Sequence, residues 1–166
     1  MIVTDVTMLR QPSKPMDPHN RGAMESIRQR LEREIERLER LQRLQREIPQ
    51  QKAVVGLAAP QVGRKHRAFM IQVYDGLNDK FEWWFVVNPR ILSRTDGIVE
   101  NTEGCMSLPN LQVVVTRSRQ ITVQDNYDGG TYVLTGDEAV IFQHELDHLD
   151  GILIQDRQSD VLAIIL

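Results

Sequence analysis

The chain has 166 residues, with 20 lysines and arginines against 23 aspartates and glutamates, and one cysteine. This length is typical of one domain with a substantial core, and we predict a single domain over residues 1–166. The single cysteine excludes an intramolecular disulfide framework and a Cys₄ metal site, while the net charge of −3 argues against a dedicated nucleic-acid binder.

The first long element is an amphipathic helix predicted over residues 22–48, before Pro49. Its apolar residues recur at steps of three and four along the chain: Ile27, Leu31, Ile35, Leu38, Leu41, Leu44 and Ile48. Its charged residues include Glu36–Arg40 and Glu39–Arg43 at the i,i+4 spacing that favours ion pairs. Three interpretations stay open: a solvated face over a core-facing stripe, a coiled-coil or partner-binding helix, and RNA or ribosome contact through the arginines.

After this helix, short runs rich in valine, isoleucine and aromatic residues predict strands over 68–74, 81–87, 111–115, 120–124 and 131–134. A final helix is predicted from about Thr135 to Asp150, because Thr135 and Glu138 have capping-box spacing and Gly151 is a stop signal. The apolar end, residues 161–166, is expected to form a strand against the core or a partner surface. The fold class is therefore α+β, with mostly antiparallel strands.

The last helix carries the sharpest chemical signal, Gln143-His144-Glu145-Leu146-Asp147-His148. Residues four apart share a helical face, so His144 and His148 can direct ring nitrogens at one metal ion. Glu145 lies close enough to handle the proton of a metal-bound water. The motif predicts a metal centre on this helix.

The third ligand of this centre stays open on the residues alone. A metzincin histidine is absent, because Ile154 stands at its place, and no glutamate follows Glu145. Cys105 has the most telling context, since Gly104 beside it lets a thiolate on a turn approach a metal closely. The other candidates are Asp156, Asp160, His19 and His66.

A third segment, Val55-Gly56-Leu57-Ala58-Ala59-Pro60-Gln61, combines small residues with an amide side chain. Gly56 and the paired alanines allow close approach of the backbone to a ligand. Gln61 supplies a neutral donor that suits a developing oxyanion.

Together these segments resemble the peptide deformylases, in the same order along the chain. The matching motifs are Gly56-Leu57-Ala58-Ala59-Pro60-Gln61, Glu103-Gly104-Cys105-Met106-Ser107 and His144-Glu145-Leu146-Asp147-His148. The resemblance covers residues 50–157. It implies an α+β metalloenzyme, with strands around a central metal-binding helix, that removes the formyl group from the N-terminal methionine of newly made polypeptides.

The resemblance also implies a role for each motif residue. The implied metal ligands are Cys105, His144 and His148. Fe²⁺ is the expected native ion, with Zn²⁺, Ni²⁺ or Co²⁺ as alternatives. A metal-bound water would attack the formyl carbon, with Glu145 as general base and then acid. The Gln61 side chain and the Met106 backbone N–H would hold the oxyanion.

Substrate contacts are expected by the same match. The peptide backbone is expected to pair with Val55–Gly56, and the methionine side chain to enter a pocket at Val140–Ile141. Arg117 is expected to pair with Glu103 and steady the cysteine turn. Val54 stands where the family has its first glycine, and we expect its side chain to narrow the cleft or stiffen its edge.

Two other functions remain as alternatives. The first is a His-Glu-x-x-His zinc peptidase with a third ligand other than Cys105. The second is a catalytically silent deformylase-like binding protein, which Glu145 and Gln61 disfavour because a binder needs neither.

Location and partners are predicted from what the sequence lacks. No stretch approaches the roughly 20 apolar residues that span a bilayer, and Met1–Thr7 lacks the pattern of a secretory signal. We expect a cytoplasmic protein that acts on formyl-methionyl nascent peptides near the ribosome, with no membrane or sequence-specific nucleic-acid partner. The oligomeric state stays open, with a dimer through the N-terminal helix as one alternative.

Overall fold

The computed structural model describes residues 1–44, 54–95 and 97–158. Its helices are α1 (Val6–Leu9), α2 (Arg21–Leu44) and α3 (Gly136–Leu149), with single 3₁₀ turns η1 (Ala59–Val62) and η2 (Ile154–Arg157). Its strands are β1 (Gly56–Ala58), β2 (Ala68–Asp75), β3 (Lys80–Val87), β4 (Arg90–Arg94), β5 (Ile98–Cys105), β6 (Leu108–Ser118), β7 (Gln120–Gln124) and β8 (Thr131–Thr135).

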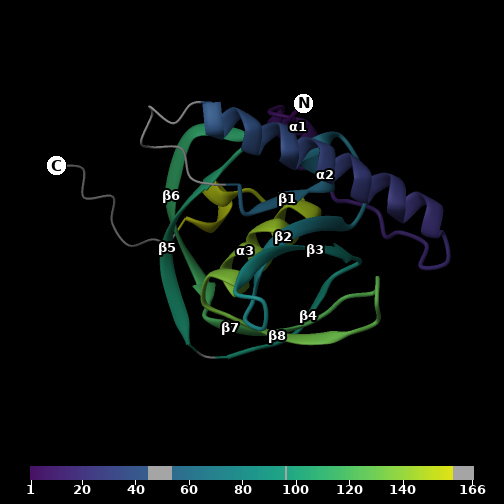
Figure 1. Cartoon of the computed structure of the whole chain (residues 1–166). Coiled ribbons are helices and arrows are strands. Elements are labelled where there is room, and N and C mark those ends of the chain that lie inside the picture. Colours follow the sequence, from purple (N-terminus) through teal and green to yellow (C-terminus); the bar gives the residue numbers. More distant parts are fainter. Residues whose placement is uncertain (45–53, 96, 159–166) are drawn as a thin grey trace.

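A three-stranded antiparallel sheet, in the order β1-β2-β3, lies between α2 and α3 (Figure 1). Side chains alternate between the two faces of a strand. Met70 of β2 and Phe85 of β3 therefore pack with α2, whereas Phe69 of β2 packs with Phe142 of α3. This arrangement buries both faces of the sheet.

The remaining strands surround α3 from its other sides. They form a sheet in the order β4-β7-β8 and the long hairpin β5-β6, and every pair of these strands is antiparallel. Figure 1 shows α3 at the centre, with β5 and β6 on one side and β7 and β8 below. The predicted α+β fold, antiparallel strands around a central helix with a long helix near the N-terminus, is confirmed.

Three strands lie where the sequence pattern predicts none, namely β1, β4 and β5. β5 reads Ile-Val-Glu-Asn-Thr-Glu-Gly-Cys, which lacks an apolar face. It is held instead by pairing with β6, from Ile98 opposite Ser118 to Glu103 opposite Val113. β5 has no alternation of apolar and polar residues, so the pattern that predicts a strand does not reveal it.

The long helix is confirmed from Arg21 to Leu44, while residues 45–48 lie outside the described residues, as do residues 161–166. The expected pairs Glu36–Arg40 and Glu39–Arg43 do not form within the described part of α2. The ion pairs of this helix are Arg28 with Glu25 and Glu32, and Arg37 with Glu34. Exposed i,i+4 pairs stabilise a helix by only about 0.3–0.5 kcal/mol, so solvation of the long side chains competes with them.

The predicted capping box of the last helix is also wrong. Thr135 is the N-cap residue, but its side chain makes no cap hydrogen bond. Glu138 instead accepts a hydrogen bond from the backbone N–H of Tyr74 at 2.7 Å, so its carboxylate connects α3 to β2. Within the described residues, no helix is long and apolar enough to cross a membrane.

Candidate metal centre and active site

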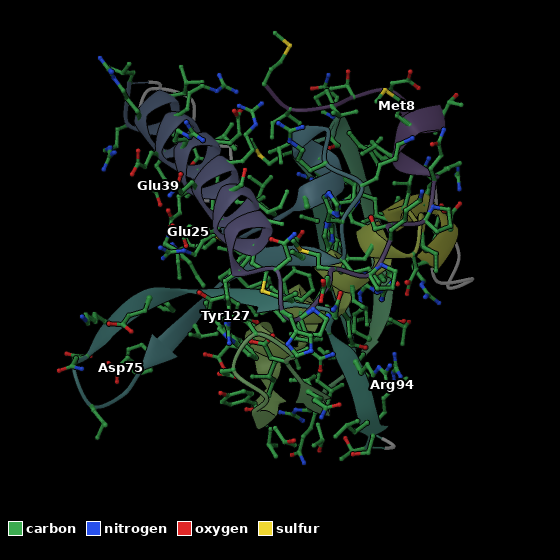
Figure 2. The ribbon with its side chains drawn as sticks, turned by 90° about the vertical axis from the view of Figure 1, so that its right-hand side faces the viewer. Met8, Glu25, Glu39, Asp75, Arg94 and Tyr127 are labelled. Atoms are coloured by element: carbon green, nitrogen blue, oxygen red, sulfur yellow. The ribbon has the colours of Figure 1, made fainter. Side chains whose placement is uncertain are left out.

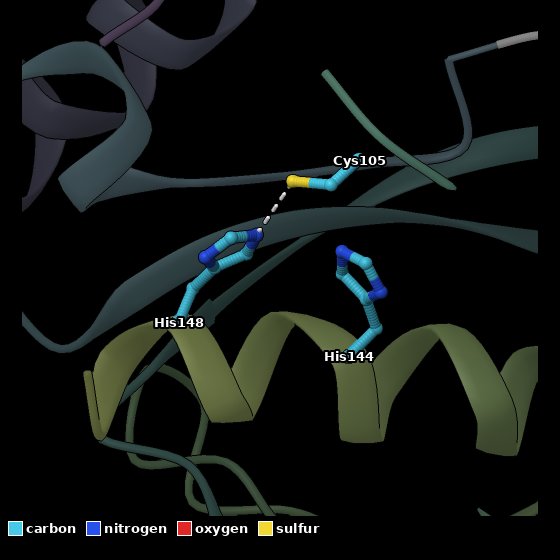
Figure 3. Close-up of side chains that lie close together, drawn as sticks. All are labelled: Cys105, His144 and His148. Carbon is cyan, nitrogen blue, oxygen red and sulfur yellow. Dashed lines mark hydrogen bonds between the residues drawn. The ribbon is translucent and has the colours of Figure 1, made fainter. Parts of the chain in front are cut away.

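Cys105, at the end of β5, faces the two histidines of α3 (Figure 3). One ligand atom from each of Cys105, His144 and His148 lies within 4.8 Å of the other two. Cys105 Sγ is 3.2 Å from His148 Nε2. A thiolate and two imidazoles form a donor set that suits a divalent transition ion such as Zn²⁺ or Fe²⁺. The three residues therefore fit one metal ion.

The other third-ligand candidates do not belong to this cluster. Among the described residues, the group that could hold a metal contains Cys105 and neither His19 nor His66. Asp156 pairs with Arg10 at 2.8 Å instead, and Asp160 lies outside the described residues.

A chain of buried charges orients His144. Its Nδ1 lies 2.9 Å from Glu103 Oε2, which leaves Nε2 for a metal ion. Arg117 of β6 donates to both oxygens of Glu103 at 2.8 Å, so the two residues expected to pair are in contact. Arg117 also donates to Asp147, whose other oxygen accepts from Arg157 at 2.8 Å.

The pKa values of these groups follow from their surroundings. Burial alone would raise the pKa of Glu103, but hydrogen bonds from Arg117 and His144 lower it to about 2. Burial lowers the pKa of His144, yet hydrogen bonds with Cys105 and Glu103 raise it to about 10. Burial and the neighbouring His144 lower the pKa of His148. A metal ion competes with protons for such donors, so its binding depends on pH.

Glu145 lies beside this cluster, against β1. Its side chain is buried, and Oε2 has no hydrogen-bond partner among the described residues. A Cβ atom built on Gly56 would lie 2.4 Å from Glu145 Oε1, so only glycine leaves room for the carboxylate. Burial raises the pKa of Glu145 to about 7, which is the range in which a carboxylate both accepts and donates protons near neutral pH.

Gln61 lies in η1, with its amide buried next to Cys105. Its Oε1 accepts from the Ala58 backbone N–H at 2.8 Å. Its Nε2 donates to Ser107 Oγ at 3.3 Å and to Cys105 Sγ at 3.5 Å. Met106 occupies the turn between Cys105 and Ser107. The Gln61 amide therefore lies in contact with the turn that carries Cys105 and Met106.

The first motif forms an edge strand. β1 pairs with β2 on one side, and the Val55 carbonyl accepts from the Gln72 N–H at 2.8 Å. Because backbone groups alternate in direction along a strand, the N–H and C=O of Gly56 face the free edge. Val54 is buried and its N–H donates to Gln42 of α2, and its effect on the width or stiffness of the cleft stays a prediction.

Val140 and Ile141 lie at different positions around α3. Val140 is four residues before His144 and shares its face, and it is half-buried. Ile141 packs against the core cluster that contains Phe142. Ile141 is three residues before His144 and seven before His148, so both side chains border the face of α3 that carries the two histidines.

Sequence reasoning assigned no role to Asp147, Arg157 or Ser107. Asp147 carries a usable signal, since an acidic residue on a buried helix needs a cationic partner. The partners themselves, Arg117 and Arg157, come from β6 and η2. Ser107 shows no signal of its own, because its role arises only from the position of Gln61.

The chain matches the family described as polypeptide deformylase over residues 1–162. It is 35% identical to the peptide deformylase of Thermotoga maritima over 162 residues, which cover 96% of this chain and 86% of that protein. The crystal structure of a Thermotoga maritima peptide deformylase has a TM-score of 0.73 at 34% identity, covering 96% and 97% of the two chains. A probable peptide deformylase from synechococcus phage S-SSM7 has a TM-score of 0.76 at 28% identity, covering 95% and 98%. The chain therefore belongs to the polypeptide deformylase family.

Proposed function

We propose that this protein hydrolyses the formyl group from the N-terminal methionine of newly made polypeptides. Deformylation of N-formylmethionine is the function of the family, whose members are metal-dependent hydrolases. The observation that carries the proposal is one site that joins a Cys-His-His cluster to a buried carboxylate, Glu145, beside the free edge of β1.

Cys105, His144 and His148 would hold the ion, with Fe²⁺ as the native metal and Zn²⁺, Ni²⁺ or Co²⁺ as substitutes. When bound, the ion supplies a Lewis acid that polarises the formyl carbonyl and lowers the pKa of water. Glu103 keeps the His144 ring in the orientation that leaves Nε2 free, because its bond to Nδ1 holds the ring in place.

Glu145 takes the proton of the attacking water and passes it to the departing amine. Water oxygen adds to the formyl carbon, the carbon–nitrogen bond then breaks, and formate and a free N-terminus are released. The Gln61 Nε2 and the Met106 N–H donate hydrogen bonds to the oxyanion that forms in between. In the free protein, Gln61 Nε2 donates a hydrogen bond to Ser107 Oγ, which fixes the orientation of the amide.

The peptide binds by adding a strand to the free edge of β1. Gly56 supplies the N–H and C=O for this pairing, next to Val55. Val140 and Ile141 contact the methionine side chain. Arg117 supports the site at a distance, since it holds Glu103 in place.

Several broader proposals go with this activity. Formylated chains emerge from the ribosome, so we place the protein in the cytoplasm near the ribosome. The domain limits 1–166 stay a prediction, and a dimer through α2 stays one alternative for the oligomeric state.

Formate release from formyl-Met-Ala-Ser tests the activity, on protein purified without oxygen and with its metal content measured. Glu145→Gln should lose about 10²-fold or more in turnover while it keeps its metal. Near-normal turnover by the metal-loaded variant would show that Glu145 is not the base. A wild-type protein with a full complement of metal and no formate release would support the silent binding protein. Metal retention by Cys105→Ala, together with endopeptidase activity, would support the zinc peptidase.

A further inference from the structure

A groove of about 280 Å³ lies between α2 and β3, on the face of the sheet opposite α3. Its floor is apolar and consists of Met70, Trp83 and Phe85. Its wall is a row of glutamates from α2, namely Glu32, Glu36 and Glu39, together with Arg28. We call this feature the β3 groove. The sheet separates it from the metal centre.

The wall of the β3 groove has an excess of negative charge. Arg28 is shared between Glu25 and Glu32, whereas Glu36 and Glu39 form no ion pair within the described part of the chain. Figure 2 shows Glu25 and Glu39 on the same side of α2, toward the β2–β3 hairpin whose turn begins at Asp75. The carboxylates therefore favour a cationic occupant.

The β3 strand is also an edge of its sheet. Among the described strands it pairs only with β2. The Val87 N–H and C=O point away from β2, because they bond to Asp125 and Asn126. Backbone groups alternate in direction along a strand, so those of Phe85 and Trp83 point the same way. No described residue bonds to them there, and an unpaired row of this kind is a template for another strand.

We propose that the β3 groove binds an extended, lysine- or arginine-rich segment of another protein, which adds a strand to the edge of β3. Alternate side chains of an added strand stand about 6.6–6.8 Å apart on one face. The glutamates of the wall follow one another at about 4.5–6 Å along the axis of α2. Two successive alternate residues of the segment can therefore each face a carboxylate of the wall across the apolar floor.

The charge of the wall distinguishes this occupant from a second copy of the chain. Antiparallel pairing of β3 with β3 of another copy would bring two glutamate walls together. Like charges that face each other across an interface oppose association. A basic segment avoids that repulsion and offers Glu36 and Glu39 cationic partners, which the described residues do not supply.

A short fluorescein-labelled peptide of alternating lysine and valine tests the proposal by fluorescence anisotropy, with a glutamate–valine peptide of equal length as control. Glu36→Lys should weaken binding of the lysine peptide by about fivefold or more, since it replaces attraction by repulsion. Glu100→Lys makes the same change of charge at an exposed position on β5 and should leave binding within about twofold. Glu39→Lys makes the same change of charge at a second glutamate of the groove wall.

Amide hydrogen exchange shows where the peptide lies. The lysine peptide should slow exchange at Trp83 and Phe85, whose N–H groups would join the new ladder. Equal weakening by Glu36→Lys and Glu100→Lys would overturn the proposal, because binding would then reflect net charge alone. Equal binding of the glutamate peptide, or unchanged exchange at both amides, would overturn it too. A dimer of the free protein with both amides already protected would assign the groove to a second copy.

Discussion

Gly56→Ala is the most direct test of the contact between β1 and the proposed base. The added Cβ would lie 2.4 Å from Oε1, 2.9 Å from Cδ and 3.0 Å from Cγ of Glu145. An ordinary contact of this kind begins at 3.4 Å. The carboxylate must therefore move by about 1 Å, which is a displacement that costs about 10²-fold in rate when it affects a reacting group.

The variant should stay folded although its turnover falls. The atoms that clash belong to the end of a side chain, which can rotate, and overpacking of this size costs about 1–3 kcal/mol. Alanine also keeps the backbone groups of β1 that pair with β2. We therefore expect a folded protein with a full complement of metal and a turnover that is about 10²-fold lower.

Formate release, metal analysis and thermal unfolding measure these three quantities on one preparation. Gly97→Ala is the matched control, because its Cβ would meet nothing closer than 3.8 Å. Should Gly56→Ala turn over within about twofold of the wild type, the position of Glu145 would not matter to the reaction, and the proposed base would be wrong. A loss of metal in Gly56→Ala alone would place the defect in the metal cluster instead.

Three further predictions concern the buried polar groups and the metal. Glu103→Gln should lower the free energy of unfolding of the metal-free protein by about 3 kcal/mol, because it leaves the buried Arg117 without its bidentate partner. Urea unfolding measures this free energy, and a decrease below about 1 kcal/mol would contradict the prediction. The pKa of Glu103 is about 2 in the folded protein, below its ordinary 4.5. The stabilisation by Glu103 is therefore complete above pH 4.5 and is lost as the pH falls toward 2. The free energies of unfolding of the wild type and of Glu103→Gln should accordingly become equal in acid. Gln61→Glu keeps an acceptor for the Ala58 N–H but removes the Nε2 donor, so kcat should fall by about 10²-fold, and an unchanged kcat would exclude Gln61 from the oxyanion site. Chelation of the metal should abolish formate release and lower Tm, both recovering with added Fe²⁺, while activity in metal-free protein would refute the role of Cys105.

The metal centre could be predicted largely because its chemistry follows from local spacing. His144 and His148 share a helical face at four residues apart, whatever the rest of the chain does. The candidate third ligand is different, since Cys105 and His148 are 43 residues apart in the sequence and meet through the fold. On the residues alone that choice stayed open among five candidates, and among the four that the structure describes, Cys105 is the one brought to the histidines.

The buried pair of Glu103 and Arg117 beside His144 was harder to predict from the residues, because its position depends on β5, a strand without an apolar face. β5 exists through its pairing with β6, which places Glu103 opposite Val113 and Arg117 opposite Val99. Glu103 and Arg117 are thus four positions apart in register, and the length of the arginine side chain lets it reach both carboxylate oxygens. A lysine has a single ammonium and no planar fork, so it could not make the same bidentate pair. The residue type at position 117 follows from the register of the β5-β6 hairpin, and the sequence does not reveal this register because β5 lacks the apolar alternation that would predict a strand.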